Sequence, residues 1–144
     1  MVQKKEMTAD FKKLTYDATM LRDAWNKFQS TATMLVNGGW TTDHILSFIE
    51  WIKDSEYSSQ LFPGSSLGTL LISKPRNGKL NYQQTLSISY NNQTKLFTMK
   101  YSDWDLIDSP EESEKAIQWT VTCPGSDLNR NFIEFINQSN WRSL

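Results

Sequence analysis

The stretch LNYQQTLSISYNNQTKLFTMKY, residues 80–101, decides the fold. Apolar side chains fall on even positions in its first half and, after the polar segment 91–94, on odd positions. Such alternation is typical of strands with one buried face. Opposed residues of an antiparallel hairpin have a constant number sum, so a turn at 91–94 pairs Ile88 with Phe97. The same register pairs Leu86 with Met99, and both strands then present one apolar face.

Two further segments have the strand pattern. Residues 67–73 form a short apolar run, and residues 117–123 alternate, with Ile117, Trp119, Val121 and Cys123 on the apolar side. Together with the hairpin they predict a four-stranded antiparallel meander. Its opposite face is polar, and Lys100 is its only charged residue; the other members of that face are Gln83, Thr85, Ser87, Ser89, Thr98, Gln118, Thr120 and Thr122.

Helical spacing appears on both sides of these strands. Apolar residues from Met7 to Leu35 advance by steps of three and four, which predicts a helix from about residue 9 to 36, capped by Thr8. That helix either breaks near Ser30–Thr33 or overhangs the body and pairs with a second copy, which leaves monomer and homodimer open.

A second helix is expected after Thr41 or Thr42 and a last one after Asp127. Because the sheet has one apolar face, we expect all helices on that face. The prediction is a single two-layer α+β domain over residues 1–144, with N-terminal helices and one C-terminal helix packed on one face of the sheet.

Bulk properties exclude several classes. The formal net charge of the 144 residues is -1, and the basic residues are dispersed, so no nucleic-acid surface is expected. No segment has the apolar length of a signal peptide or a membrane span, and Cys123 is the single cysteine. We therefore expect a soluble, cytoplasmic protein that does not interact with membranes.

No catalytic motif is complete. Gly64-Ser65-Ser66-Leu67-Gly68 has the spacing of a nucleophile elbow, but helical pattern precedes it and strand pattern follows it, the reverse of an elbow. The one histidine, His44, lies upstream and is expected to be an exposed residue in the first turn of its helix. Cys123 is expected to be buried as a small hydrophobe. We assign no catalytic residue.

Metal and cofactor sites are not expected either. One histidine and one cysteine are too few for a zinc site. The segment from Asp103 to Glu114 partly imitates a calcium loop, but Ile107 and Asp108 stand where that loop needs an oxygen ligand and a glycine.

Two surfaces remain as candidate partner sites. The segment 103–114 carries six carboxylates and no basic residue, with Trp104 as an aromatic anchor among them. The uncharged sheet face is the second, because interface cores are depleted of charge. The alternatives are that Trp104 packs into the core and that the face is merely solvated. The candidate partner-binding residues are Asp103, Trp104, Asp105, Asp108, Glu111, Glu112, Gln83, Thr85 and Ser87.

These features favour a small non-enzymatic module that binds a basic protein partner. In size, slight acidity and lack of catalytic groups the chain resembles the immunity and inhibitor proteins that neutralise bacterial toxins, a likeness of type without a shared motif. The alternative is a small-ligand-binding protein or enzyme. Its pocket would lie between sheet and helices, lined by Tyr82, Tyr90, Tyr101 and the tryptophans.

Overall fold

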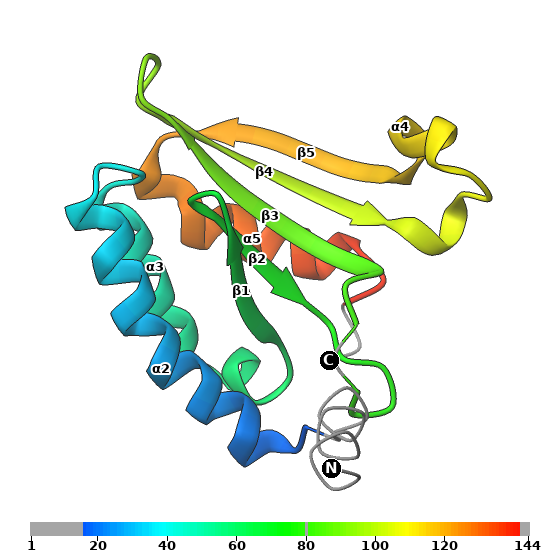
Figure 1. Ribbon diagram of the computed structural model, residues 1–144, viewed down its shortest axis with the longest axis horizontal. Coiled ribbons are helices and arrows are strands. Elements are labelled where there is room, and N and C mark those ends of the chain that lie inside the picture. Colours follow the sequence, from blue (N-terminus) through cyan, green and yellow to red (C-terminus); the bar gives the residue numbers. More distant parts are fainter. Residues whose placement is uncertain (1–15, 80, 142–144) are drawn as a thin grey trace, which may run out of the picture.

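The computed structural model describes residues 16–79 and 81–141, and within these the chain forms an α+β fold on a five-stranded antiparallel sheet (Figure 1). Neighbouring strands in the sheet are also neighbours in sequence, so the predicted meander is confirmed with one strand more than expected. The strands are β1 (Phe62–Ser66), β2 (Thr69–Ser73), β3 (Gln84–Asn91), β4 (Leu96–Asp103) and β5 (Ile117–Cys123).

The unpredicted strand is β1. It pairs with β2 from Phe62↔Ser73 to Ser66↔Thr69, through a two-residue turn at Leu67 and Gly68. Both turn residues have positive φ, 50° and 84°, as the tight turns of twisted hairpins require. Pro63 and Gly64 hide this strand in the sequence, because both residues disfavour strands. Proline is tolerated here because β1 lies at the sheet edge, where one side of the backbone needs no ladder partner.

The β3–β4 register differs from the predicted one by two residues. Ile88 pairs with Met99 rather than with Phe97, and Leu86 pairs with Tyr101. The Asn91 side chain accepts hydrogen bonds from the backbone N–H groups of Gln93 and Thr94, which closes the turn one residue later than expected. A shift of two keeps the number sum odd, so the apolar residues of both strands still share one face.

A register shift between β4 and β5 overturns part of the predicted face assignment. Tyr101 pairs with Trp119, whereas the next residue of β4, Ser102, pairs with Ile117. Gln118 is therefore the extra residue of a bulge, which reverses the alternation at this point. Ile117 joins the face of Ser102, and Gln118 lines a cavity with Tyr101 on the other face.

Three long helices lie against one face of the sheet: α2 (Ala18–Asn37), α3 (Asp43–Lys53) and α5 (Leu128–Gln138) (Figure 1). α2 begins at Ala18, later than the predicted start near residue 9, because Asp17 is extended and its carboxylate caps the helix by accepting a hydrogen bond from the Met20 N–H. The predicted cap Thr8 lies outside the described residues. The helix continues through Ser30–Thr33 without the break that we considered, and the Thr33 hydroxyl donates to the Gln29 carbonyl within it. The second and last helices are confirmed.

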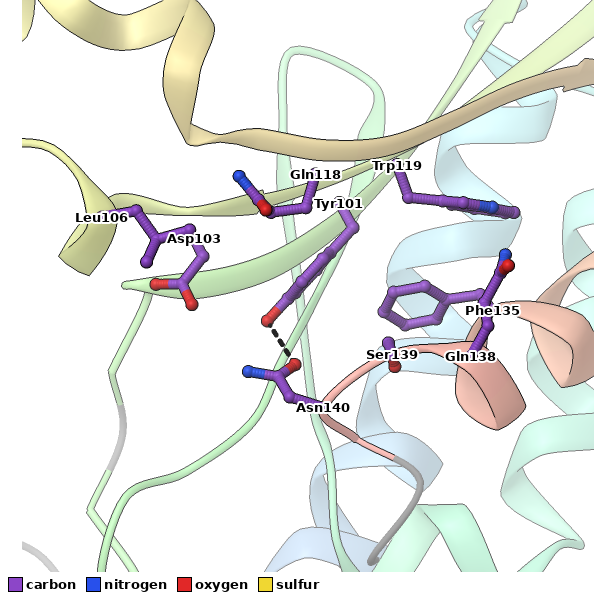
Figure 2. Close-up of a pocket in the computed structure, with 9 residues that line it drawn as sticks. All are labelled: Tyr101, Asp103, Leu106, Gln118, Trp119, Phe135, Gln138, Ser139 and Asn140. Atoms are coloured by element: carbon purple, nitrogen blue, oxygen red, sulfur yellow. Dashed lines mark hydrogen bonds between the residues drawn. The ribbon is translucent and has the colours of Figure 1, made fainter.

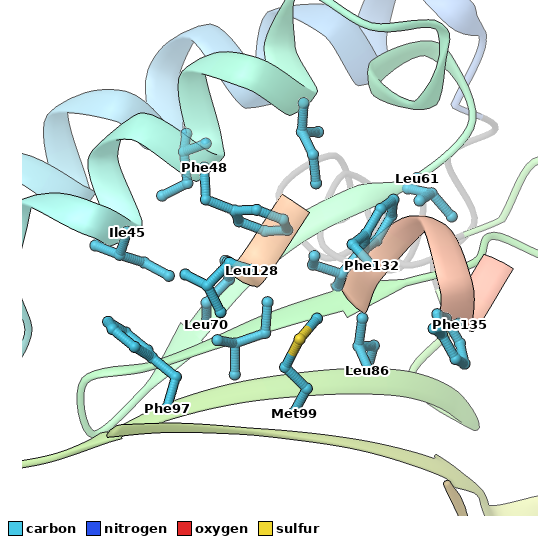
Figure 3. Packing of buried hydrophobic residues seen from close by; sticks show 14 of the residues in the cluster. Ile45, Phe48, Leu61, Leu70, Leu86, Phe97, Met99, Leu128, Phe132 and Phe135 are labelled. Atoms are coloured by element: carbon cyan, nitrogen blue, oxygen red, sulfur yellow. The ribbon is translucent and has the colours of Figure 1, made fainter. Parts of the chain in front are cut away.

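The core fills the space between these helices and the sheet (Figure 3). Leu86 and Ile88 of β3 and Phe97 and Met99 of β4 are buried there against all three helices. Deep in this core the Trp25 indole N–H donates to the Leu61 carbonyl at 2.8 Å. The apolar stripe of α2 is thus buried within its own chain from residue 21 to 32. A homodimer through the part of the stripe before residue 16 stays a prediction.

Short turns follow β4 and connect it to β5. They are η2 (Trp104–Leu106), η3 (Pro110–Glu112) and α4 (Ser113–Ala116), and Pro110 occupies the first turn of η3. Trp104, Ser113 and Glu114 line a groove with Thr85 and Lys100 of the outer sheet face. One end of that face is therefore partly covered, contrary to the prediction that it is left wholly free. Among the described residues no helix has the length and apolarity to cross a bilayer.

Candidate functional site

The acidic segment begins with a carboxylate that turns into the protein. Asp103, the last residue of β4, is 6% exposed, and its carboxylate accepts hydrogen bonds from the Asp105 backbone N–H and from the Gln84 side-chain amide. The first of these bonds satisfies an N–H at the start of η2, the ordinary use of an aspartate cap. Asp103 is therefore removed from the acidic surface to which the sequence assigned it.

The remaining carboxylates divide into two groups. Asp105 forms an ion pair with Arg76, and Glu112 lies 3.7 Å from the Lys115 ammonium. Asp108, Glu111 and Glu114 are exposed and take part in no ion pair within the described part of the chain. The negative charge available to a partner is thus concentrated on these three residues.

The outer face of the sheet and the acidic segment form one surface. Trp104, 41% exposed, lies beside Thr85, Ser87 and Lys100, and Ile117 completes the apolar part. We call this site the Trp104 groove; it encloses about 290 Å³ and is lined by Leu71, Thr85, Ser87, Lys100, Ser102, Trp104, Ser113, Glu114 and Ile117. The backbone fixes this arrangement, because the Trp104 N–H donates to the Gln83 carbonyl at 2.8 Å.

The structure thus brings together three of the predicted partner-binding residues, Trp104, Thr85 and Ser87. Gln83 lies before β3 rather than on it, and it contributes its carbonyl to the position of Trp104. The acidic residues predicted with them do not line the groove; these are Asp103, Asp105, Asp108, Glu111 and Glu112.

Sequence reasoning missed two apolar members of the groove. Leu71 has the opposite parity to its buried neighbours Leu70 and Ile72, so strand alternation could have placed it on the outer face. Ile117 could not have been found in this way, because the bulge that turns it outward leaves no signal in the sequence.

A second cavity lies on the other side of the sheet (Figure 2). It encloses about 400 Å³ between β4, β5 and the C-terminal end of α5. We call it the aromatic pocket; its lining residues are Tyr101, Asp103, Leu106, Gln118, Trp119, Phe135, Gln138, Ser139 and Asn140. Its volume lies in the range of small-molecule sites, roughly 300–1,000 Å³.

Aromatic rings form one wall of the aromatic pocket. The ring centroids of Trp119 and Phe135 are 5.3 Å apart, and those of Tyr101 and Phe135 are 4.9 Å apart. Figure 2 shows the side chains of Asp103, Gln118 and Asn140 grouped around the Tyr101 hydroxyl, with the other two rings beyond it. That hydroxyl donates to the Asn140 side-chain oxygen at 2.9 Å. Burial, reinforced by the negative charge of Asp103, raises the pKa of Tyr101.

Only part of the aromatic lining predicted from the sequence is present. Tyr101 and Trp119 line the pocket, whereas Tyr82 is 48% exposed with its hydroxyl beside Gly64. Tyr90 lies in a different hollow, together with His44 and Lys95. The three tyrosines are therefore separated, because Tyr82 lies before β3 and Tyr90 lies at the opposite end of that strand from the pocket.

The single residues considered for catalysis are far from a reactive arrangement. Ser66 is the last residue of β1 and precedes a hairpin turn, so no helix follows it as an elbow requires. His44 is exposed in the first turn of α3. Cys123 is buried, and burial raises the pKa of its thiol, which favours the unreactive protonated form.

The described ranges 16–79 and 81–141 hold no candidate metal site, because nowhere in them do three or more histidine, cysteine or acidic side chains come together.

Comparison of the chain with protein families, with curated proteins and with solved structures finds no match.

Proposed function

We propose that the protein is a non-enzymatic binding module that engages a basic protein partner through the Trp104 groove and the carboxylates beside it. The observation that carries this proposal is the position of Trp104, a partly exposed aromatic ring next to Thr85 and Ser87 on a sheet face that carries one charged residue, Lys100. Aromatic anchors near the centre of charge-depleted surfaces contribute most of the binding energy in many interfaces.

A partner can cover the hydroxyl groups of the groove without leaving them unpaired. The Ser87 hydroxyl donates to the Lys100 carbonyl, and the Thr85 hydroxyl donates to the Tyr82 carbonyl. A buried polar group costs free energy mainly when it loses its hydrogen bonds. Because these donors are already paired within the sheet, a partner can exclude water from them without replacing those bonds.

Charge supports the choice of a basic partner. Asp108, Glu111 and Glu114 are free of ion pairs within the described residues, and Glu114 also lines the groove. Exposed charges at the rim of an interface mainly increase the association rate and favour a partner of opposite charge. This combination suits an inhibitor or immunity type of protein that blocks a basic surface on its target.

A crosslinking experiment tests the location. A photoreactive amino acid is placed at Ser87, inside the groove, and in a matched protein at Met34, which is 73% exposed on α2. In cells that express the protein, the Ser87 probe is expected to crosslink one basic protein that the Met34 probe does not reach. No crosslinked protein, or equal crosslinking from both positions, contradicts the proposal.

Variants then distinguish the contribution of the aromatic anchor to binding from that of the carboxylates at the rim. Trp104→Ala is expected to weaken binding of that partner by tenfold or more, since anchor residues cost about 2 kcal/mol or more. Replacing Asp108, Glu111 and Glu114 by their amides is expected to slow association and to reduce its dependence on salt. Unchanged affinity in Trp104→Ala would place the interface elsewhere.

Small-molecule binding is a second candidate function, and the aromatic pocket is the observation that favours it. It uses the opposite face of the sheet from the Trp104 groove, so the two functions are compatible.

A further inference from the structure

We propose that the aromatic pocket binds a small organic cation, an ammonium group attached to an aromatic or alkyl part. This inference does not depend on the protein partner proposed above. It rests on three features of the pocket: the carboxylate at one end, the hydrogen-bond acceptor beside it, and the aromatic rings that form one wall.

The carboxylate at the pocket is Asp103. Its two oxygen atoms accept one hydrogen bond each, from a backbone N–H and from the Gln84 amide, and neither donor is charged. Ionised carboxylates can accept about four hydrogen bonds, so acceptor capacity remains. The Arg76 guanidinium forms its ion pair with Asp105 instead. Among the described residues none that lines the cavity is basic, and the charge of this lining is that of Asp103 alone.

One further group presents a free acceptor beside this carboxylate. The amide nitrogen of Gln118 donates to the carbonyls of Lys115 and Ala116, and its side-chain oxygen stays unused. The Tyr101 hydroxyl, in contrast, donates to Asn140 and has the Trp141 indole as a second partner. A ligand group beside Asp103 is favoured when it donates hydrogen bonds and carries positive charge, as an ammonium does.

The ring wall accommodates the rest of the ligand. Phe135 and Tyr101 are buried, whereas Trp119, inclined by 38° to Phe135, is half-buried and presents the accessible part of this wall. Ring faces attract cations within about 6 Å and also bury apolar groups well. The predicted ligand thus spans from the Asp103 carboxylate to the Trp119 ring.

Three probes of similar shape and different charge test the ligand class: phenethylammonium, 2-phenylethanol and 3-phenylpropionate. Binding to the full chain is measured by calorimetry and by NMR shifts of the tryptophan indole N–H groups. Phenethylammonium is expected to bind about tenfold or more tightly than the neutral alcohol, because hydrogen bonds to charged groups are stronger by more than 1 kcal/mol. The propionate is expected not to bind.

Two substitutions that introduce opposite charges at position 118 provide the decisive test. Gln118 is exposed at the pocket, so Gln118→Arg is expected to abolish phenethylammonium binding and Gln118→Glu to strengthen it several-fold. Asp103→Asn is expected to weaken binding at least tenfold, whereas Asp108→Asn, the same change outside the pocket, leaves it unchanged.

Because Asp103 is buried, its variant is compared with wild type by circular dichroism first; if it fails to fold, the Gln118 pair decides. Three results overturn the proposal: none of the three probes binds, the alcohol or the propionate binds as tightly as the amine, or Gln118→Arg binds phenethylammonium as wild type does.

Discussion

The inner and outer faces of the sheet are made by alternate residues of the same strands, yet they lie in very different environments. On β3, Leu86 and Ile88 are almost wholly buried under the helices, while Ser87 between them lines the open Trp104 groove. The inner face stabilises the fold through apolar burial. The outer face contributes little to that burial and keeps a surface that a partner can use. One strand therefore serves stability and recognition at neighbouring positions.

The contrast is sharpest at the bulge. Before it, parity decides which side a residue faces; beyond it, Ile117 and Gln118 exchange sides. This exchange gives the Trp104 groove an apolar residue and gives the aromatic pocket an amide. Both candidate sites thus lie at the same end of β4 and β5, on opposite faces, and a single irregularity shapes both.

The largest expected difference between the faces is in unfolding free energy at two adjacent residues. Leu86→Ala removes a fully buried side chain and is expected to cost ~2–5 kcal/mol, from lost burial and the cavity left behind. Ser87→Ala, one residue further, is expected to change stability by less than ~0.5 kcal/mol. Urea denaturation measures both. Similar values for the two variants would break the comparison.

Close packing on the helical side extends to the loop that follows β5. A Cβ atom added at Gly125 would lie 2.3 Å from the His44 Cγ, near the start of α3. Gly125→Ala is therefore expected to cost ~1–3 kcal/mol, as overpacking does. Alanine at position 44 would keep the His44 Cβ, which also lies within the clash, whereas His44→Gly removes both ring and Cβ. Gly125→Ala is therefore expected to cost much less in the His44→Gly background than in wild type, measured by thermal or urea unfolding. An equal cost in both backgrounds would place the strain elsewhere.

Alkaline pH provides a smaller test of the inner face. Burial raises the pKa values of Tyr101 and Cys123 above their ordinary values of 10.0 and 9.0. Both groups are neutral when protonated, so the folded state holds their protons more tightly than the unfolded state does. The contribution is fully present below the unfolded pKa values and is lost as pH rises through the folded ones.

The free energy of unfolding is therefore expected to fall from about pH 9 upward. Tyr101→Phe is expected to have a flatter pH dependence in that window, although it loses the hydrogen bond to Asn140. Urea unfolding at a series of alkaline pH values measures the slope, with Tyr90→Phe as control. An unchanged slope in Tyr101→Phe would exclude this group as the source.

The smallest expected effect sharpens the assignment at the bulge. Ile117, 39% exposed on the outer face, is expected to lose less than ~1 kcal/mol of stability on replacement by threonine. Were it on the inner face, as strand parity alone predicts, the polar hydroxyl would be buried and the loss would be several-fold larger. Thermal unfolding of Ile117→Thr therefore reports which face the residue occupies.

Sequence reasoning was accurate where a feature repeats over many residues. The α2 stripe, the alternation of β3 and β4 and the amphipathic α5 are each supported by several positions, so a single irregular residue does not hide them. It failed where one residue changes the geometry. The turn at Asn91 shifts the β3–β4 register by two residues, and Pro63 disguises the strand pattern of β1. The bulge exchanges the faces on which Ile117 and Gln118 lie.

The candidate sites follow the same division. Thr85 and Ser87 were placed on the outer face by parity, and for Trp104 the sequence left open an exposed anchor among carboxylates or a place in the core. That these residues meet in one groove depends on the backbone bond from Trp104 to Gln83, which the sequence does not encode in any local pattern. Asp103 shows the converse, because strand parity with Tyr101 would have placed it inward, but its place in an acidic run assigned it to the surface.

By itself the amino-acid sequence determined the α+β class, the antiparallel meander and the sides of most strand residues, because periodicities of 2 and 3.6 residues are local consequences of backbone geometry. Only the tertiary structure decided which polar and aromatic side chains share a cavity. Those contacts depend on a bulge and on how the segment 104–116 folds back, and both are settled by hydrogen bonds and packing between residues distant in the chain.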